Sequence, residues 1–385
     1  MKQYVKPETE SFQTTPNCTL CASAQVGVEL GKMKVSNFNS IVPFFVLMLS
    51  GLLTLPSCKN GNGDVQQPSA FKKGEVVTIT TNPIGAGNKT PRRVHIGSET
   101  SGEAQLVWDA NDQLRVIVPN TETETPYPFS DFNLTAGENT KTGTFTGTMP
   151  TEGSEFFLAY PCGNVTGSNW NATNKTVKFQ HVEVPNVQDF KVGETSFNSG
   201  IMPVVGYGEA EDGVLTGYTT IVGGALRVKL TNKTGDAITF NKIQLLVHDA
   251  CVGESESAAK TSVWSSGYTV DYNVESKTVT PSGTSADNNN IVLNLSQDVT
   301  LANDATSGDF YFVMVAPLYF KTKAISGGDA SFTVYLFNHE GKVTSPSDLE
   351  TEQPVATTSF NYNIDIAPGD IVEGTLEMTE SQTNP

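Results

Sequence analysis

Apolar and polar side chains alternate with a period of two residues through most of the chain after residue 73, and this pattern limits what the chain can fold into. The clearest example is the segment GALRVKL, in which Leu226, Val228 and Leu230 share one face and Arg227 and Lys229 share the other. Such alternation is typical of strands with one buried face and one face in water. After residue 58, no long stretch shows a sustained period of 3.6, so helices should be few and short. The sequence therefore predicts an all-β protein.

The other alternating segments are bounded by Gly, Pro, Asn and Asp, the residues that favour turns. The segment 310–318 (FYFVMVAPL) is apolar on both faces, which predicts a central strand. We expect strands at residues 74–81, 106–108, 114–118, 142–147, 156–160, 177–184, 224–230, 243–247, 291–295, 310–318, 332–336, 360–366 and 370–378.

An apolar segment at residues 41–55 ends in Leu-Pro-Ser-Cys, and the sequence turns polar directly after Cys58. A bilayer-spanning helix needs about 20 residues, so this segment is short for a membrane span but suits the core of an export signal. A small residue followed by cysteine is typical of a bacterial lipoprotein signal. The sequence therefore predicts a fatty acyl chain such as palmitate on Cys58. It also predicts that the protein lies at the outer membrane and cell surface. The alternative for residues 41–55 is a transmembrane helix or a buried core helix.

Residues 1–32 are too long and too acidic for the start of such a signal, whereas Met33 and Lys34 suit one. We therefore expect translation to begin at Met33. The CTLC segment at residues 18–21 has neither a second ligand pair for zinc nor the βαβ context of a redox site, so it predicts no metal.

A boundary between two domains is predicted at residues 206–213 (GYGEAEDG), where the composition turns to Gly and acidic residues. Removing residues 1–57 from the 385 leaves 328 residues, which also exceeds what one hydrophobic core usually fills. The expected fold is two tandem β-sandwich domains with transthyretin-like or Greek-key connections. The expected division is a signal segment with its extension at 1–57, a flexible tether at 58–73, and β-sandwich domains at 74–212 and 213–385.

The net charge limits the classes of binding partner, and the cysteines limit the possible disulfides. The formal net charge of −17 repels phosphate groups, so no nucleic acid partner is expected. Two cysteines of the body, Cys162 and Cys251, can form a disulfide in an exported protein or remain two buried thiols.

No pattern of catalytic residues stands out. His95, His181, His248 and His339 are scattered, and neither HExxH nor GxSxG occurs. The segment at residues 109–113 (DANDQ) lacks the later ligands of a calcium loop and is interpreted as a turn. We expect no enzymatic activity, no metal and no cofactor.

Two tryptophans are candidate glycan contacts. Trp170 and Trp264 lie in polar segments that we expect to be loops, where an indole face can stack on a sugar ring. The alternative is that both rings pack on the edge of the sandwich.

Four motifs, in this order and behind the lipoprotein signal, resemble the fimbrillin (Mfa-like) family of Gram-negative anaerobes. They cover most of residues 58–240. The motifs are an early strand followed by Arg92 and Arg93, Trp108-Asp109-x-x-Asp112 before an alternating strand, KTGTFTG at 141–147 with FFLAYP at 156–161, and ALRVKLTN at 225–232.

The resemblance implies a lipoprotein subunit of a fimbria. A trypsin-like protease would cut after Arg93 or Arg92, release residues 74–81 with the lipid, and leave a groove for a strand of a neighbouring subunit. The resemblance makes 370–378 the candidate donor, with Val372, Leu376 and Met378 filling the groove; the alternative is an edge strand of its own domain. Partners would be other fimbrial subunits and a host protein or glycan. Without cleavage, the chain would be a lipid-anchored adhesin or carbohydrate-binding lipoprotein that does not polymerise.

Overall fold

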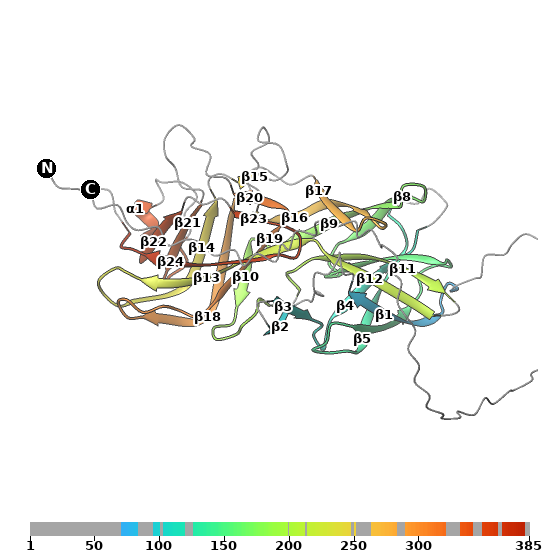
Figure 1. Cartoon of the computed structure of the whole chain (residues 1–385), viewed down its shortest axis with the longest axis horizontal. Helices are drawn as coiled ribbons and strands as arrows, with labels where there is room; N and C mark the ends of the chain where they lie inside the picture. Colours follow the sequence, from blue (N-terminus) through green and yellow to red (C-terminus); the bar gives the residue numbers. More distant parts are fainter. Residues whose placement is uncertain are drawn as a thin grey trace, which may run out of the picture. The chain divides into compact units, whose positions relative to one another are not determined.

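Nearly every element of the described chain is a β-strand (Figure 1). The exception among these residues is α1 (Leu349–Glu352), a single helical turn. The all-β prediction is confirmed, and most expected strands are present with shifts of a few residues at their ends. The expected strands 310–318 and 360–366 are wrong as single strands, because each range includes residues of two separate strands. The computed structural model describes residues 71–83, 95–100, 103–119, 126–198, 200–211, 214–247, 250–251, 263–282, 289–320, 332–341, 349–360 and 364–381.

The first large sheet closes on itself as a barrel, which leaves no unpaired sheet edge along its strands. Inward-facing glycines make room for large rings: a Cβ atom on Gly147 would clash with the ring of Phe132, and one on Gly208 with Phe156. In order around the barrel, the strands are β1 (Val76–Pro83), β12 (Val214–Ile221), β11 (Val204–Glu211), β7 (Glu155–Tyr160), β4 (Gln113–Ile117), β5 (Phe129–Ala136) and β6 (Gly143–Thr148).

The remaining described strands form smaller sheets. A five-stranded sheet has the order β10 (Val187–Phe190), β18 (Asn290–Leu301), β14 (Ile238–Val247), β21 (Phe332–Phe337) and β22 (Ala356–Phe360). A four-stranded sheet has the order β17 (Thr278–Ser282), β16 (Ser265–Asn273), β9 (Thr176–Val184) and β8 (Thr166–Asn171). One three-stranded sheet has the order β19 (Phe310–Val315), β13 (Gly223–Asn232) and β24 (Ile371–Met378). Another has the order β15 (Ala250–Cys251), β20 (Leu318–Phe320) and β23 (Ile364–Ile366). Strand β2 (His95–Thr100) pairs with β3 (Glu103–Val107).

Most of the predicted boundary at residues 206–213 lies within strand β11, and residues 212–213 lie outside the described residues. Strands β11 and β12 pair over eight residue pairs, and both belong to the barrel. In addition, β9 pairs with β16 and β10 pairs with β18, so strands from the two expected ranges share sheets. The described part of this Gly- and acid-rich segment is therefore a strand of the barrel, and the sheets do not follow the expected division.

Strand β19 differs from its prediction in pairing. All of its residues are buried, as an apolar segment requires, but it lies at the end of its three-stranded sheet, where β13 is its one partner among the described strands. The expectation of a central strand is wrong because a side chain takes the place of the second neighbour. The amide of Gln188 donates to the carbonyl oxygen of Val313 at 2.7 Å and accepts from its N–H at 3.0 Å.

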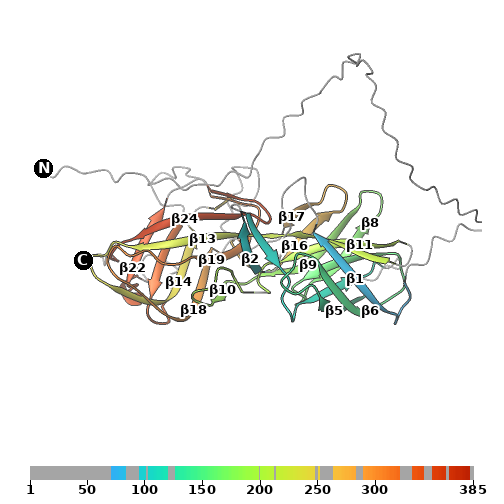
Figure 2. The ribbon, with the colours of Figure 1, turned by 60° about the horizontal axis from the view of Figure 1, so that its bottom comes forward.

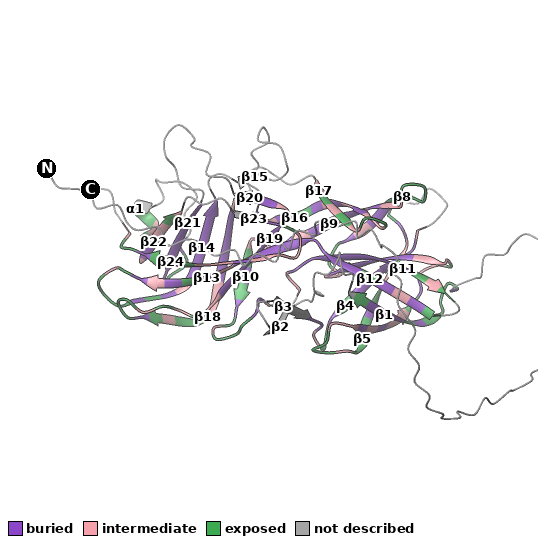
Figure 3. Cartoon of the chain, in the orientation of Figure 1, coloured by how far each residue is buried: buried purple, intermediate pink, exposed green. Residues whose placement is uncertain are grey.

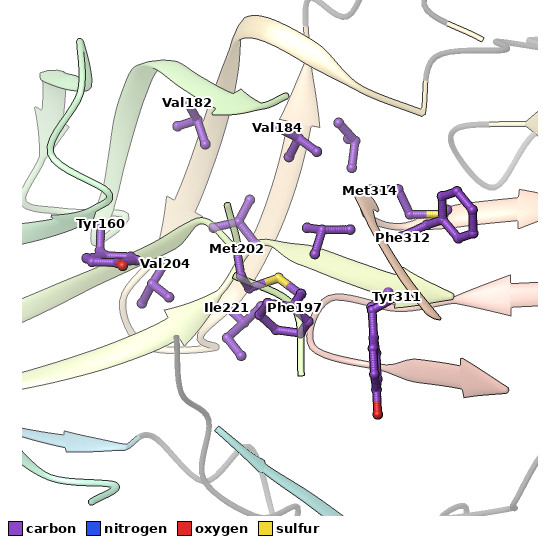
Figure 4. Packing of buried hydrophobic residues seen from close by; sticks show 14 of the residues in the cluster. Tyr160, Val182, Val184, Phe197, Met202, Val204, Ile221, Tyr311, Phe312 and Met314 are labelled. Atoms are coloured by element: carbon purple, nitrogen blue, oxygen red, sulfur yellow. The ribbon is translucent and has the colours of Figure 1, made fainter. Parts of the chain in front are cut away.

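Figure 2 shows the strands from a second direction. One hydrophobic cluster runs through most of the described strands, and Figure 3 shows buried positions interspersed with intermediate and exposed ones along several of them. Figure 4 shows a part of it where barrel residues such as Tyr160 and Val204 lie near residues of β9 and β19. There Phe197 contacts Tyr311 edge-to-face with ring centroids 6.3 Å apart. The described residues accordingly belong to one compact unit.

Candidate strand-addition site

Strand β1 completes the barrel between two neighbours that are far from it in sequence. Residues 76–81 pair antiparallel with β6, and residues 79–83 pair parallel with β12. A parallel neighbour cannot be reached through a tight hairpin, so the slot of β1 is not built by local connections. Removing β1 would leave β6 and β12 each with an unpaired edge.

Three side chains of β1 point into the barrel: two are apolar, and the third carries a hydroxyl group. Val77 is 8% exposed, Ile79 is fully buried and Thr81 is 1% exposed. The outward face carries Val76, which is 69% exposed, and Thr78, whose hydroxyl lies 3.0 Å from that of Thr146 on β6. The slot therefore holds two apolar side chains followed by one hydroxyl.

The hydroxyl of Thr81 is hydrogen-bonded inside the barrel. Its Oγ1 donates to the carbonyl oxygen of Gly143 and accepts from the N–H of the same residue, each at 3.1 Å. Gly143 has no side chain there because Trp108 and Phe145 occupy the space: a Cβ atom would lie 2.9 Å from Trp108 Nε1. This end of the slot is thus polar on one side and aromatic on the other.

The chain is anchored to the barrel already before β1. Phe71 exchanges two backbone hydrogen bonds with Gly153, at 3.1 and 3.2 Å, and its buried ring packs against Phe156 at 6.2 Å. Residues 71–73 therefore belong to the folded body, although the sequence predicted them as the end of a flexible tether.

The candidate donor segment lies in a second slot of its own chain. Strand β24 pairs parallel with β13 over eight residue pairs, and Val372, Leu376 and Met378 are all buried. Val222 alone separates β12 from β13, so β1 and β24 are parallel neighbours of two consecutive strands. The structure thus places β24 as an edge strand of its own sheet, the alternative that the sequence left open.

Contacts at both ends and in the middle hold β24 there. Before it, the N–H of Gly369 donates to the carbonyl of Gly223 at 2.7 Å. In the middle, Arg227 on β13 forms an ion pair with Glu373. After it, Thr379 exchanges two backbone hydrogen bonds with Thr357, at 2.9 and 3.0 Å.

The two candidate glycan-binding tryptophans are partly buried against the core. Trp170 belongs to β8, so its expected loop position is wrong. Its ring contacts Phe157 at 5.0 Å and stacks with Tyr207 at 6.2 Å, and Lys175 Nζ lies 5.3 Å from its centroid. Trp264 immediately precedes β16. These internal contacts favour the packing alternative for Trp170.

Several predicted sites lie outside the described residues: the lipidation site Cys58 and the cleavage candidates Arg92 and Arg93. Cys162 is a free thiol. Burial, followed by the nearby carboxylate of Asp131, raises the pKa of the Cys162 thiol to about 12, which keeps it protonated and unreactive.

The aspartate motif at residues 109–112 is a turn, as predicted. Asp112 Oδ2 accepts from the N–H of Asp109 at 2.6 Å, and Asp112 Oδ1 accepts from the hydroxyl of Tyr160 at 2.7 Å. Both carboxylate oxygens of Asp112 therefore accept hydrogen bonds from groups of the chain itself. In the part of the chain that the structure describes, no three His, Cys, Asp or Glu side chains gather as metal ligands would. No helix among these same residues is long and apolar enough to cross a membrane.

Sequence reasoning missed one polar group of the barrel. The guanidinium of Arg115 is buried and binds Asp131 through Nε and Nη2, at 2.7 and 2.9 Å. Its Nη1 donates to the carbonyls of Gly163 and Val165, and the ring of Phe129 lies 4.1 Å from Cζ. Arg115 alternates with the buried residues Leu114 and Val116 on β4, a position that usually faces water in a half-buried strand.

No family model and no curated protein matches the sequence. Among solved structures, the chain is similar to a candidate cell adhesion protein of Bacteroides ovatus, with a TM-score of 0.36, 11% identity, and 81% of this chain and 97% of that chain covered. It is also similar to the fimbrial anchor protein Mfa2 of Porphyromonas gingivalis, with a TM-score of 0.29, 10% identity, and 80% and 92% covered.

A candidate cell adhesion protein of Bacteroides uniformis gives a TM-score of 0.31 at 12% identity, covering 71% of this chain and 92% of that chain. These proteins are of the class that the fimbrillin resemblance implies. At such TM-scores and identities, the likeness by itself assigns no function to this chain.

Proposed function

We propose that this protein is a structural or adhesive subunit of a cell-surface fimbria, in which a strand from another subunit takes the place of β1. The observation that carries this proposal is the slot of β1 between β6 and β12. The first strand of the barrel, β1, fills this slot. No hairpin joins β1 to either of its neighbours, β6 and β12. A separate polypeptide can therefore fill the slot with the same backbone pairing.

The order of the sequence fits such an exchange. Cys58 would anchor the precursor in the outer membrane, and β1 follows it. Arg92 and Arg93 lie between β1 and the rest of the barrel. A cut after Arg93 would leave β1 and the lipid on one fragment and the open barrel on the other. The acceptor slot lies beside β6 and β12, and the candidate donor β24 lies beside β13. Because donor and acceptor are different segments, a contact between subunits would be head-to-tail and could propagate.

The experiment that tests the proposal is mass spectrometry of the surface-exposed protein, combined with electrophoresis without heating. An N-terminus at Val94, together with a ladder of SDS-resistant multimers, is expected for a polymerising subunit. An intact N-terminus at an acylated Cys58 with no multimers would show that the protein stays an anchored monomer.

A second candidate is a lipid-anchored subunit or adhesin that does not polymerise. The contacts that hold β24 on β13 favour it, because donating β24 would break eight residue pairs and the ion pair between Arg227 and Glu373. Purified protein cut after Arg93 distinguishes the two candidates. A subunit that donates β24 forms multimers by itself, whereas an anchored subunit stays monomeric until a partner strand is added.

A further inference from the structure

The slot of β1 ends in a pocket that is built for a hydroxyl group. Thr81 is 1% exposed, and its Oγ1 both donates to and accepts from the backbone of Gly143. An apolar side chain at this buried position would take the hydroxyl partner away from both backbone groups. Leaving a buried polar group unsatisfied is costly, so the pocket discriminates between side chains.

A second polar group lies beside the same glycine. Trp108 is 2% exposed, and its indole N–H has no hydrogen-bond partner within the part of the chain that the structure describes. A Cβ atom on Gly143 would lie 2.9 Å from this nitrogen. The wall of the pocket therefore offers another donor, which adds to its preference for a side chain with an oxygen.

The space around Thr81 also limits size. Gly217 on β12 is its partner in the parallel register, and a Cβ atom there would meet Leu158 at 2.5 Å and the methyl group of Thr81 at 3.7 Å. Thr81 thus lies between a glycine on β6 and a glycine on β12, and Leu158 takes the space beside Gly217. A side chain the size of threonine or serine fits without displacing a neighbour.

The chain's own β24 does not carry this pattern at its alternating positions. Aligning Val372 with Val77 puts Gly374 in the place of Ile79 and Leu376 in the place of Thr81. A shift by two residues puts Met378 in the hydroxyl pocket. A further shift puts the carboxylate of Glu380 there, and burying a charge without a cationic partner is unfavourable.

We propose that the slot of β1 selects a strand other than this chain's β24: one with two apolar side chains at alternate positions, followed two residues later by threonine or serine. This inference rests on the proposed exchange of β1. It identifies the partner by its side-chain order, and it makes Thr81 and Gly143 the residues that determine specificity at the end of the slot.

Competition between peptides in the full chain tests this proposal. A site for a sequence-specific protease is placed within residues 84–94, the chain is cut, and a fluorescent peptide with the sequence of residues 74–83 is allowed to exchange. Unlabelled peptides with Thr81→Ser should compete almost as well as the native sequence. Peptides with Thr81→Val, and a peptide with the sequence of residues 370–379, should compete about tenfold less well or worse. Equal competition by either of the last two peptides would overturn the proposal.

If the labelled native peptide does not enter the cut chain, the proposed strand exchange fails at this slot, and the pocket is then tested in the uncut protein. Thr81→Val should lower the folding equilibrium constant about tenfold, whereas Thr81→Ser should leave it nearly unchanged. Thr78→Val is the matched control, because the hydroxyl of Thr78 lies on the outer face of the same strand. A Thr81→Val protein as stable as the wild type would overturn the hydroxyl pocket independently of any exchange.

Discussion

At the scale of single residues, the barrel is held by polar side chains whose hydrogen bonds are satisfied inside it. Arg115 is the largest example, since its guanidinium binds one carboxylate and two backbone carbonyls while its side chain is 8% exposed. Replacing Arg115 with an apolar residue removes a buried cation. Asp131 and the two carbonyls then lose their hydrogen-bond donor. The group therefore contributes by satisfying several acceptors at once.

We predict that Arg115→Met lowers the free energy of unfolding by about 3 kcal/mol, as the removal of one partner from a buried ion pair does. Denaturant unfolding followed by tryptophan fluorescence measures this loss. Lys229→Met is the matched control: Lys229 is also a cation on a strand, but it is half exposed and its Nζ lies 3.8 Å from Asp309. The control should change stability by less than about 1 kcal/mol. Equal losses in the two variants would contradict the role given to Arg115.

The same pair predicts a pH dependence. The hydrogen bond from Arg115 holds the pKa of Asp131 below its ordinary value of 3.8. Because the carboxylate is favoured in the folded state, its stabilisation is complete above the ordinary pKa and is lost as pH falls through the lowered one. Asp131→Asn should therefore be less stable than the wild type at about pH 5, and the difference should shrink at about pH 2.5. A difference that is the same at both pH values would rule this linkage out.

At the scale of elements, the alternation in the sequence was sufficient to locate most strands but not to say which strands pair. Strand β13 shows the success: Leu226 and Val228 are buried and Lys229 is exposed, as a half-buried strand requires. The pairing of β11 with β12 shows the limit, because the Gly- and acid-rich end of β11 looks the same in sequence as a linker between domains. Pairing depends on contacts distant in sequence, which a period of two does not encode.

The candidate site was predictable only in part for the same reason. The position of β1 as the first strand followed from composition, but its parallel pairing with β12 and the hydrogen bonds of Thr81 depend on β12 and β6, which lie far along the chain. Gln188 gave no signal at all in the sequence. Its amide acts as a substitute for a neighbouring strand at Val313.

We predict that Gln188→Met opens this edge of β19. Methionine has nearly the same length but cannot donate to the carbonyl of Val313 or accept from its N–H, so both groups lose a buried partner. Hydrogen exchange at the amide of Val313 should become at least about tenfold faster, and stability should fall by about 1–3 kcal/mol. Gln244→Met is the comparison, because Gln244 is also fully buried, on β14 of the five-stranded sheet; it should leave exchange at Val313 unchanged. Unaltered exchange in Gln188→Met would show that β19 does not depend on this side chain.

At the scale of the whole molecule, β1 and β24 occupy comparable places beside one continuous run of chain, β12 followed by β13. They differ in how they are connected. Strand β24 is fixed by the ion pair between Arg227 and Glu373 and by bonds at both of its ends, whereas β1 depends on β6, β12 and the short anchor at Phe71. A cut between β1 and β2 would therefore turn β1 into a bound ligand of the barrel, while β24 would remain part of it.

This difference predicts how the cut protein unfolds. Because a fragment containing β1 must associate again for the barrel to close, the melting temperature of protein cut after Arg93 should rise with protein concentration, and added peptide of residues 74–83 should raise it further. The uncut protein should melt at one temperature at all concentrations, and the double variant Arg92→Gln, Arg93→Gln should behave as uncut after the same protease treatment. Calorimetry over a hundredfold range of concentration measures this, and a cut protein whose melting does not depend on concentration would show that β1 is not an exchangeable strand.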